Sequence, residues 1–199
     1  MNKAARTKTQ SRWQLVGLAT LFFGPLALAF LLYYGLPGIR PTATANHGEL
    51  ISPARPLPRL MLKDSLDRNV PDDVFINHWS LVWLGPGQCD ASCQDGLKTT
   101  AVVRQLLGKD ASRIQRVFLY SGTPPDSALI TAQTSALLVI HADDNDAKAL
   151  LDQFPKDAAG HIYIIDPHGN LMMRYPSGTD IRQGFLDDMK RLLKYSHIG

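Results

Sequence analysis

The chain has 199 residues, of which 45% are hydrophobic and 20% are charged, and its formal net charge is +3. Four of the 21 basic residues lie in the first twelve positions, so the remainder is close to neutral, with 17 basic and 18 acidic residues. A neutral remainder without a basic stripe argues against nucleic-acid binding and favours a protein or metal partner. The length suits one domain with its own core, and no internal repeat or low-complexity block is present.

An apolar segment follows the basic N-terminus. Residues 1–12 contain basic but no acidic residues, and residues 13–36 contain no charged residue. A helix over residues 13–36 reaches about 36 Å, enough to cross a hydrocarbon core of about 30 Å. We therefore predict a basic cytoplasmic tail over 1–12 and a transmembrane anchor over 13–36. The positive-inside rule places the N-terminus in the cytoplasm and the rest of the chain on the other side.

The same segment could be interpreted as a signal peptide, because Ala27 and Ala29 form a pattern that a signal peptidase cleaves. Apolar and aromatic residues continue beyond Ala29, so cleavage there would leave a hydrophobic new terminus. We favour an uncleaved anchor for this reason. Residues 37–56 are rich in Pro, Thr, Ala and Gly, which predicts a linker leading to a domain over residues 57–199.

Hydrophobic patterning predicts alternating strands and helices over the domain. Strands are expected at 60–62, 73–75, 81–84, 116–120, 136–140, 161–165 and 171–175, with turns at 64–69 and 166–170. Helices are expected at 94–107, 146–154 and 181–195, the second capped by Asp143 or Asp144 and ended by Pro155. The alternation indicates an α/β fold.

The chain has two cysteines, Cys89 and Cys93, which follow the strand at 81–84 with the spacing C-x-x-x-C. A turn at Gly85–Gly87 brings them to a helix N-terminus, where unpaired N–H groups and the helix dipole favour a thiolate. One helical turn of separation places their Cα atoms roughly 6 Å apart, which suits a disulfide or a soft metal ion. The alternative is a structural bridge. A bridge that closes so short a loop adds little stability, which favours a redox or metal role.

Two carboxylates, Asp90 and Asp95, flank the thiols. Nearby negative charge disfavours a thiolate and partly offsets the helix dipole, so we do not expect a strongly acidic nucleophile. Asp90 also suits the first turn of a helix, where a negative charge is favourable, and both interpretations stay open.

The order of elements, with a cysteine-bearing helix after a strand, a βαβ crossover, a hairpin and a final helix, resembles the thioredoxin fold. The C-x-x-x-C spacing on a tethered domain resembles the Sco/SenC family, which assists copper delivery to cytochrome c oxidase. Three segments also resemble that family: Trp83–Gly85, Val117–Asp126 (VFLYSGTPPD) and Ile162–Asn170 (IYIIDPHGN). The resemblance covers residues 57–195. It implies a central mixed sheet flanked by helices, in a periplasmic domain on an inner-membrane anchor.

The resemblance also implies copper as a candidate cofactor, held by two cysteines and a histidine. The position of the family's histidine is Ala158 in this chain, and His161 is the nearest histidine along the same strand. The candidate metal site is therefore Cys89, Cys93 and His161.

The implied function is assistance in assembling the copper centre of cytochrome c oxidase. The implied partner is an oxidase subunit or another periplasmic thiol or copper protein. One alternative is a thiol–disulfide oxidoreductase, in which Cys89 attacks a partner disulfide and Cys93 resolves the mixed disulfide. Another is a non-catalytic assembly or docking factor whose cysteines form a permanent bridge.

Overall fold

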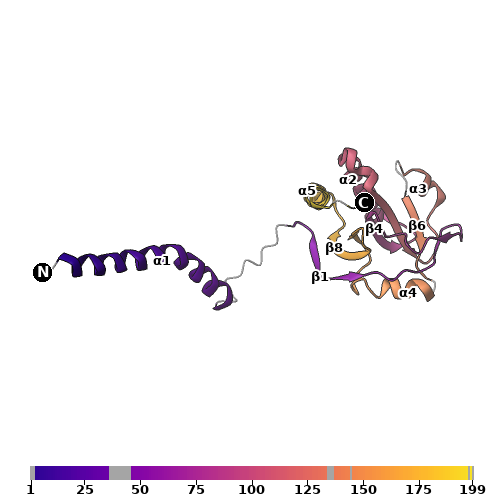
Figure 1. Cartoon of the computed structure of the whole chain (residues 1–199). Coiled ribbons are helices and arrows are strands. Elements are labelled where there is room, and N and C mark those ends of the chain that lie inside the picture. The colour runs from indigo at the N-terminus through magenta and orange to yellow at the C-terminus, as the bar shows by residue number, and fades with distance from the viewer. Residues whose placement is uncertain (1–2, 36–45, 134–136, 144, 197, 199) are drawn as a thin grey trace. The chain divides into compact units, whose positions relative to one another are not determined.

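The computed structural model of the protein describes residues 3–35, 46–133, 137–143, 145–196 and 198. The chain divides into two compact units, Met1–Ala45 and Asn46–Gly199 (Figure 1).

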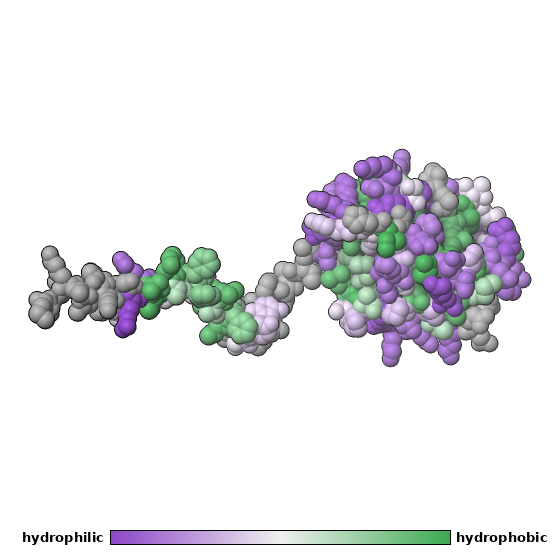
Figure 2. Space-filling model, viewed as in Figure 1, coloured by the Kyte–Doolittle hydropathy of each residue, from purple (hydrophilic) through white to green (hydrophobic). Residues whose placement is uncertain are grey.

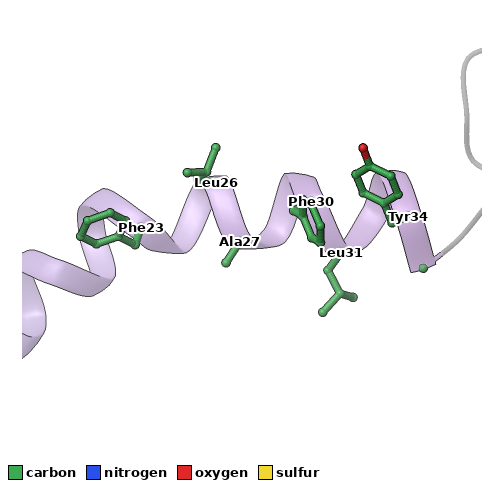
Figure 3. Close-up of a pocket in the computed structure, with 7 residues that line it drawn as sticks. Phe23, Leu26, Ala27, Phe30, Leu31 and Tyr34 are labelled. Atoms are coloured by element: carbon green, nitrogen blue, oxygen red, sulfur yellow. The ribbon is translucent and has the colours of Figure 1, made fainter.

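The first unit contains a single helix, α1 (Lys3–Gly35). It begins inside the segment predicted as a tail, and its part from Arg12 to Gly35 is long and apolar enough to cross a membrane. Large apolar side chains are exposed all along this part, and Figure 2 shows them as a hydrophobic band. Figure 3 shows side chains such as Phe23 and Phe30 projecting from the bare helix, so they line an open surface. Such a surface suits contact with lipid, as expected for a membrane anchor.

The second unit is built on an eight-stranded mixed sheet with the strand order β1-β8-β7-β4-β5-β6-β2-β3. Strands β4, β5 and β6 are parallel neighbours, and the other strand pairs are antiparallel. The strands are β1 (Glu49–Pro56), β2 (Leu62–Asp64), β3 (Asn69–Val70), β4 (Trp79–Pro86), β5 (Ile114–Ser121), β6 (Leu137–His141), β7 (His161–Ile165) and β8 (Asn170–Pro176).

Helices cover both faces of the sheet, and Figure 1 shows α2 and α5 on one side and α4 on the other. The α-helices of the domain are α2 (Ala91–Leu106), α3 (Ser127–Thr131), α4 (Asn145–Leu151) and α5 (Arg182–Tyr195), and two 3-10 helices lie at Gly108–Arg113 and Thr179–Ile181. The central position of β4 in the sheet explains why its sequence is apolar. Leu81 and Trp83 pack with α2 and α5, whereas Val82 and Leu84 pack on the α4 side, so the strand is an unbroken apolar run.

Most of the predicted elements lie within a few residues of those observed, and β7 has the predicted bounds. The prediction of a strand at 73–75 was wrong. That segment is a turn, in which the Ile76 N–H donates to the Asp73 carbonyl, and β3 pairs with β2 instead. Part of the predicted linker over 37–56 also forms structure, because β1 pairs with β8 at the edge of the sheet. Residues 36–45 and the predicted cap Asp144 lie outside the described residues.

Candidate functional site

The turn after β4 places the cysteine pair at the start of α2. The Gly87 N–H donates to the Ser121 carbonyl of β5 at 2.9 Å, and a side chain at Gly87 would overlap the carbonyl oxygen of Thr123. Glycine is therefore required for this close approach of two loops. Cys89 and Cys93 form a disulfide with 5.1 Å between their Cα atoms, close to the separation expected from one helical turn.

The two cysteines differ in their access to solvent. Cys93 is 1% exposed and packs in the core on the α2 face of the sheet, whereas Cys89 is partly exposed. Cys89 lines a depression of about 360 Å³, together with Gly87, Gln88, Gln94, Pro124, Asp126 and Leu129. A partner sulfur can therefore approach Cys89 from this depression, but cannot reach Cys93 directly.

The two carboxylates flanking the disulfide have different surroundings. Asp90 is the N-cap of α2, and its Oδ1 accepts a hydrogen bond from the Cys93 N–H at 2.9 Å. Asp95 is ion-paired with Arg182, whose Nη2 lies 2.8 Å from its Oδ1. The positive charge of Arg182 offsets the negative charge of Asp95. Among the described residues no ion pair is found for Asp90, so its negative charge stays next to the disulfide.

Further contacts fix the first turns of α2 against the segment that leads into α5. The hydroxyls of Ser92 and Ser177 are 2.8 Å apart, and the Arg182 Nε donates to Thr99 at 3.1 Å. These contacts hold the disulfide on a helix end that is tied to the end of β8 and to the start of α5. A rigid element is a suitable carrier for a reactive pair, because its geometry is set before a partner arrives.

His161 begins β7 and pairs with Leu84 at the same end of the sheet as the cysteines. Its ring lies 6.3 Å from the ring of Tyr163, which packs on the α4 face of the sheet. Since alternate residues of a strand face opposite ways, His161 points away from the face on which Cys93 is buried. Within the described part of the chain, no three His, Cys, Asp or Glu residues are grouped to hold a metal ion. The structure thus brings Cys89 and Cys93 together but does not add His161 to them.

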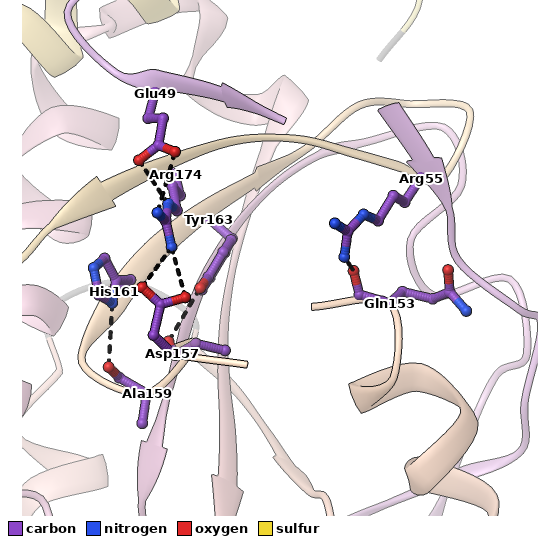
Figure 4. A network of polar contacts seen from close by, with 9 residues as sticks. Glu49, Arg55, Gln153, Asp157, Ala159, His161, Tyr163 and Arg174 are labelled. Atoms are coloured by element: carbon purple, nitrogen blue, oxygen red, sulfur yellow. Dashed lines mark hydrogen bonds and ion pairs between the residues drawn. The ribbon is translucent and has the colours of Figure 1, made fainter. Parts of the chain in front are cut away.

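Figure 4 shows how the loop before β7 is held. Arg174 donates to both Asp157 oxygens at 2.9 Å and to Glu49 at 2.8 and 3.1 Å, which joins this loop to β8 and β1. The hydrogen bond from Arg174 holds the pKa of Asp157 below its usual range. The Tyr163 hydroxyl donates to the Ala158 carbonyl at 3.2 Å, so Ala158 is fixed and buried. This is the position at which the resemblance to Sco/SenC proteins implies a histidine. Its methyl group offers no metal donor.

Sequence reasoning missed the wall of the depression opposite Cys89. The short helix α3 supplies this wall, and its N-cap is Asp126, whose Oδ1 accepts from the Ala128 N–H at 2.9 Å. An Asp placed just before a helix is a recognisable capping signal. The sequence does not reveal that Asp126 lies close to Cys89, because this contact depends on the tertiary pairing of β4 with β5.

Comparison with known families gives a match over most of the folded domain. The family model described as "Transmembrane-like, thioredoxin-like, C-terminal domain" matches residues 79–196. The chain belongs to this family. A comparison with curated proteins found no match to the sequence of this chain.

Solved structures of Sco proteins share the fold. Copper-bound Sco1 from yeast is 15% identical, with a TM-score of 0.61 over 73% of this chain and 96% of that one. Copper-bound ScoI from Bradyrhizobium japonicum is 18% identical, with a TM-score of 0.53 over 69% and 99% of the two chains. A SCO1/SenC family lipoprotein from Bacillus anthracis is 14% identical, with a TM-score of 0.57 over 72% and 99%. These likenesses confirm the predicted thioredoxin-like α/β fold and its resemblance to Sco proteins at the level of fold.

Proposed function

We propose that this protein is a membrane-anchored, Sco-type thiol protein that serves the assembly of the copper centre of cytochrome c oxidase. Its chemistry is thiol–disulfide exchange through Cys89 and Cys93. One observation carries this proposal: the disulfide lies at a helix N-terminus with one sulfur accessible from a depression and the other buried. This asymmetry suits an attacking thiol followed by a resolving thiol.

The exchange balances in two steps. The Cys89 thiolate attacks one sulfur of a partner disulfide, so that the partner's S–S bond breaks and one thiolate leaves. The Cys93 thiolate then attacks the Cys89 sulfur and expels the second partner thiolate, which forms the 89–93 disulfide seen here. Two electrons pass from the protein to its partner, and the reverse sequence oxidises a partner dithiol.

A trapping experiment tests the roles of the two cysteines. In Cys93→Ser, the mixed disulfide at Cys89 cannot be resolved, so incubation of the full chain with 2-hydroxyethyl disulfide should leave a stable adduct visible by mass spectrometry. Cys89→Ser is the matched control, and its buried thiol should stay unmodified in the folded protein. Adducts on neither variant would contradict exchange and favour a permanent bridge. An adduct on Cys89→Ser alone would reverse the assigned roles.

The proposed location is the inner membrane, with α1 as an uncleaved anchor and the domain over residues 57–199 in the periplasm. The proposed partner is an oxidase subunit or another periplasmic thiol or copper protein. The basic residues before the apolar segment support this orientation. Alkaline phosphatase fused after Gly199 should therefore be active. An inactive fusion would contradict the orientation, and a mature N-terminus near Phe30 would show cleavage of a signal peptide.

Copper binding by the reduced pair is a second candidate function, in which copper is cargo. Two observations favour it: the fold is shared with copper-bound Sco structures, and the two cysteines meet at the N-terminus of α2 with their Cα atoms 5.1 Å apart. Two thiolates are soft donors that suit Cu(I). The structure argues against His161 as the third ligand, because its ring lies on the α4 side of the sheet.

Titration of the reduced full chain with Cu(I) tests this candidate. One Cu(I) per chain should bind, and Cys89→Ser or Cys93→Ser should abolish binding. A ligand role for His161 requires that His161→Ala weakens binding by roughly 10- to 100-fold, whereas the geometry predicts no change. Absence of binding at stoichiometric copper would remove the copper function and leave thiol exchange.

A further inference from the structure

The depression beside Cys89 has an uneven distribution of charge. Asp126 is the one charged residue among the seven that line it, and the others are neutral. Asp90 follows Cys89 directly in the chain and is exposed. Cys89 therefore has one carboxylate on the next residue and another on the lining of the same depression, and these belong to the N-caps of α2 and α3.

The side chains of Asp90 and Asp126 are both exposed at the surface. Each uses Oδ1 to accept one backbone N–H, from Cys93 and from Ala128 respectively, and the described residues give neither an ion pair. Two other acidic residues of this region have side-chain partners. Asp95 is paired with Arg182, and Asp143, which accepts from the Gly122 N–H of the same loop, lies 3.2 Å from the His141 Nε2.

The groove on the other side of β4 does not share this bias. It has a volume of about 430 Å³ and is lined mostly by apolar residues, with one acid, Asp152, and one base, Lys156. The negative charge is thus specific to the side from which Cys89 is reached.

We infer that the Cys89 site selects partners whose disulfide or thiol is flanked by positive charge, and that Asp90 and Asp126 impose this preference. This inference rests on the proposed thiol exchange. It names the substrate class of that site as cationic disulfides, in a protein partner a cysteine beside Lys or Arg. The carboxylates raise the local concentration of a cationic reagent and lower that of an anionic one, and added salt screens both effects.

Small disulfides of different charge test the inference on the full chain, reduced and held in an uncharged detergent. The probes are cystamine, which is cationic, 2-hydroxyethyl disulfide, which is neutral, and 3,3′-dithiodipropionate, which is anionic. Oxidation of the protein is followed by acid quenching, alkylation and mass spectrometry. Each rate is divided by the rate of the same probe with dithiothreitol, because the leaving thiols differ in intrinsic reactivity.

The expected ratio of normalised rates, cystamine over dithiodipropionate, is roughly 10-fold at low salt, and it should fall toward 1 in about 1 M NaCl. Asp90→Asn and Asp126→Asn should each lower the ratio by about threefold, and the double variant should nearly abolish it. Asparagine is as good an N-cap as aspartate, so both helices keep their caps.

Asp72→Asn is the matched control. It removes one exposed negative charge from the turn before β4, at the opposite end of the sheet from the disulfide, and should leave the ratio unchanged. A ratio near 1 in the unmodified protein, or one that survives in the double variant, would overturn the inference while leaving thiol exchange intact. Failure of all three probes to oxidise the protein would overturn both the exchange and the selectivity that depends on it.

Discussion

Gly96 of α2 lies directly against the indole ring of Trp83 in β4, with no room for a side chain between them. Two atoms of the Trp83 ring would lie only 2.3 Å from a Cβ at position 96. This contact sets the distance between the helix that carries the disulfide and the strand that leads to it. Both residues are buried at the centre of the core cluster on that face.

Gly96→Ala should therefore destabilise the domain, although alanine is the better helix former. The gain in helix propensity is at most about 1 kcal/mol, and overpacking costs about 1–3 kcal/mol in a close-packed core. An overlap at 2.3 Å puts the cost in the upper part of this range, so denaturant unfolding should show a net loss of about 1–2 kcal/mol. The loss should shrink in a Trp83→Phe background, since the single phenyl ring is smaller than the fused indole and leaves more room beside position 96. Equal losses in both backgrounds would show that the ring does not set this distance.

The parts of the fold that the sequence predicted correctly are the strands buried on both faces. Strand β7 shows this, because a run of apolar residues from Ile162 to Ile165 leaves no other interpretation. Strand β1 was missed for the opposite reason. It is an edge strand with two prolines and mostly exposed residues, and it depends on pairing with β8, which no local pattern reveals.

The candidate site, like the fold, has parts that the sequence predicts and parts that it does not. The closeness of the two cysteines at a helix N-terminus follows from their spacing and from the strand, turn and helix pattern around them. The depression, in contrast, depends on α3 meeting the turn after β4. The face of His161 could have been predicted. The strand alternates, Ile162 packs on the α2 face, and its neighbour His161 must then face the other way. The resemblance favoured His161 because it is the nearest histidine along the strand, and its role as a metal ligand stays a prediction.

Asp188 ties the start of the folded domain to α5. Its carboxylate is 1% exposed and accepts hydrogen bonds from the N–H groups of His47 and Gly48 and from the Tyr175 hydroxyl at 2.8, 3.0 and 2.6 Å. Burial raises the pKa of Asp188, but the bonds from Tyr175, Gly48 and His47 outweigh burial and leave the pKa below its usual value. The stability that it contributes is thus complete above about pH 4 and is lost as pH falls through the lower, folded-state pKa.

Asp188→Asn should lower the free energy of unfolding by about 2–4 kcal/mol at neutral pH. The amide replaces one acceptor oxygen with an NH2 group, which cannot accept from the His47 and Gly48 N–H groups or the Tyr175 hydroxyl. The substitution should also flatten the fall in unfolding free energy as the pH drops below about 4. Asp187→Asn is the matched control. Among the described residues Asp187 accepts only from the Gln183 side chain, and its loss should change stability by less than about 0.5 kcal/mol. Equal effects of the two changes would contradict a special role for Asp188.

Arg116 is a charged residue inside the core, with 1% exposure. It donates to the Leu97 carbonyl at 2.7 Å, to Gln133 at 2.9 Å and to Thr100 at 3.0 Å, so it joins β5 to α2 and to the end of α3. Arg116→Ala should cost about 3–5 kcal/mol, because it leaves a cavity and buried acceptors without donors. Arg116→Met keeps the volume and should cost less, which separates the two contributions in denaturant unfolding.

The control for Arg116 is Arg68→Ala. Arg68 lies 2.7 Å from Asp64, but its side chain is 72% exposed, and such surface pairs contribute about 0–1 kcal/mol. A similar cost for both arginines would show that the buried contacts of Arg116 do not stabilise the domain.

Reduction of the 89–93 disulfide separates an exchangeable pair from a permanent bridge. The bridged residues are four positions apart, and closing so short a loop stabilises a protein by about 2 kcal/mol in the chain-entropy model. A domain typically has 5–15 kcal/mol of stability, so the reduced form should stay folded. Its melting temperature should fall by roughly 4–8 °C.

Thermal melts of the full chain with and without dithiothreitol measure this shift. The variant Cys89→Ser/Cys93→Ala, melted without reductant, should match the reduced protein and controls for effects of dithiothreitol itself. Unfolding on reduction would instead favour a docking factor whose bridge is structural.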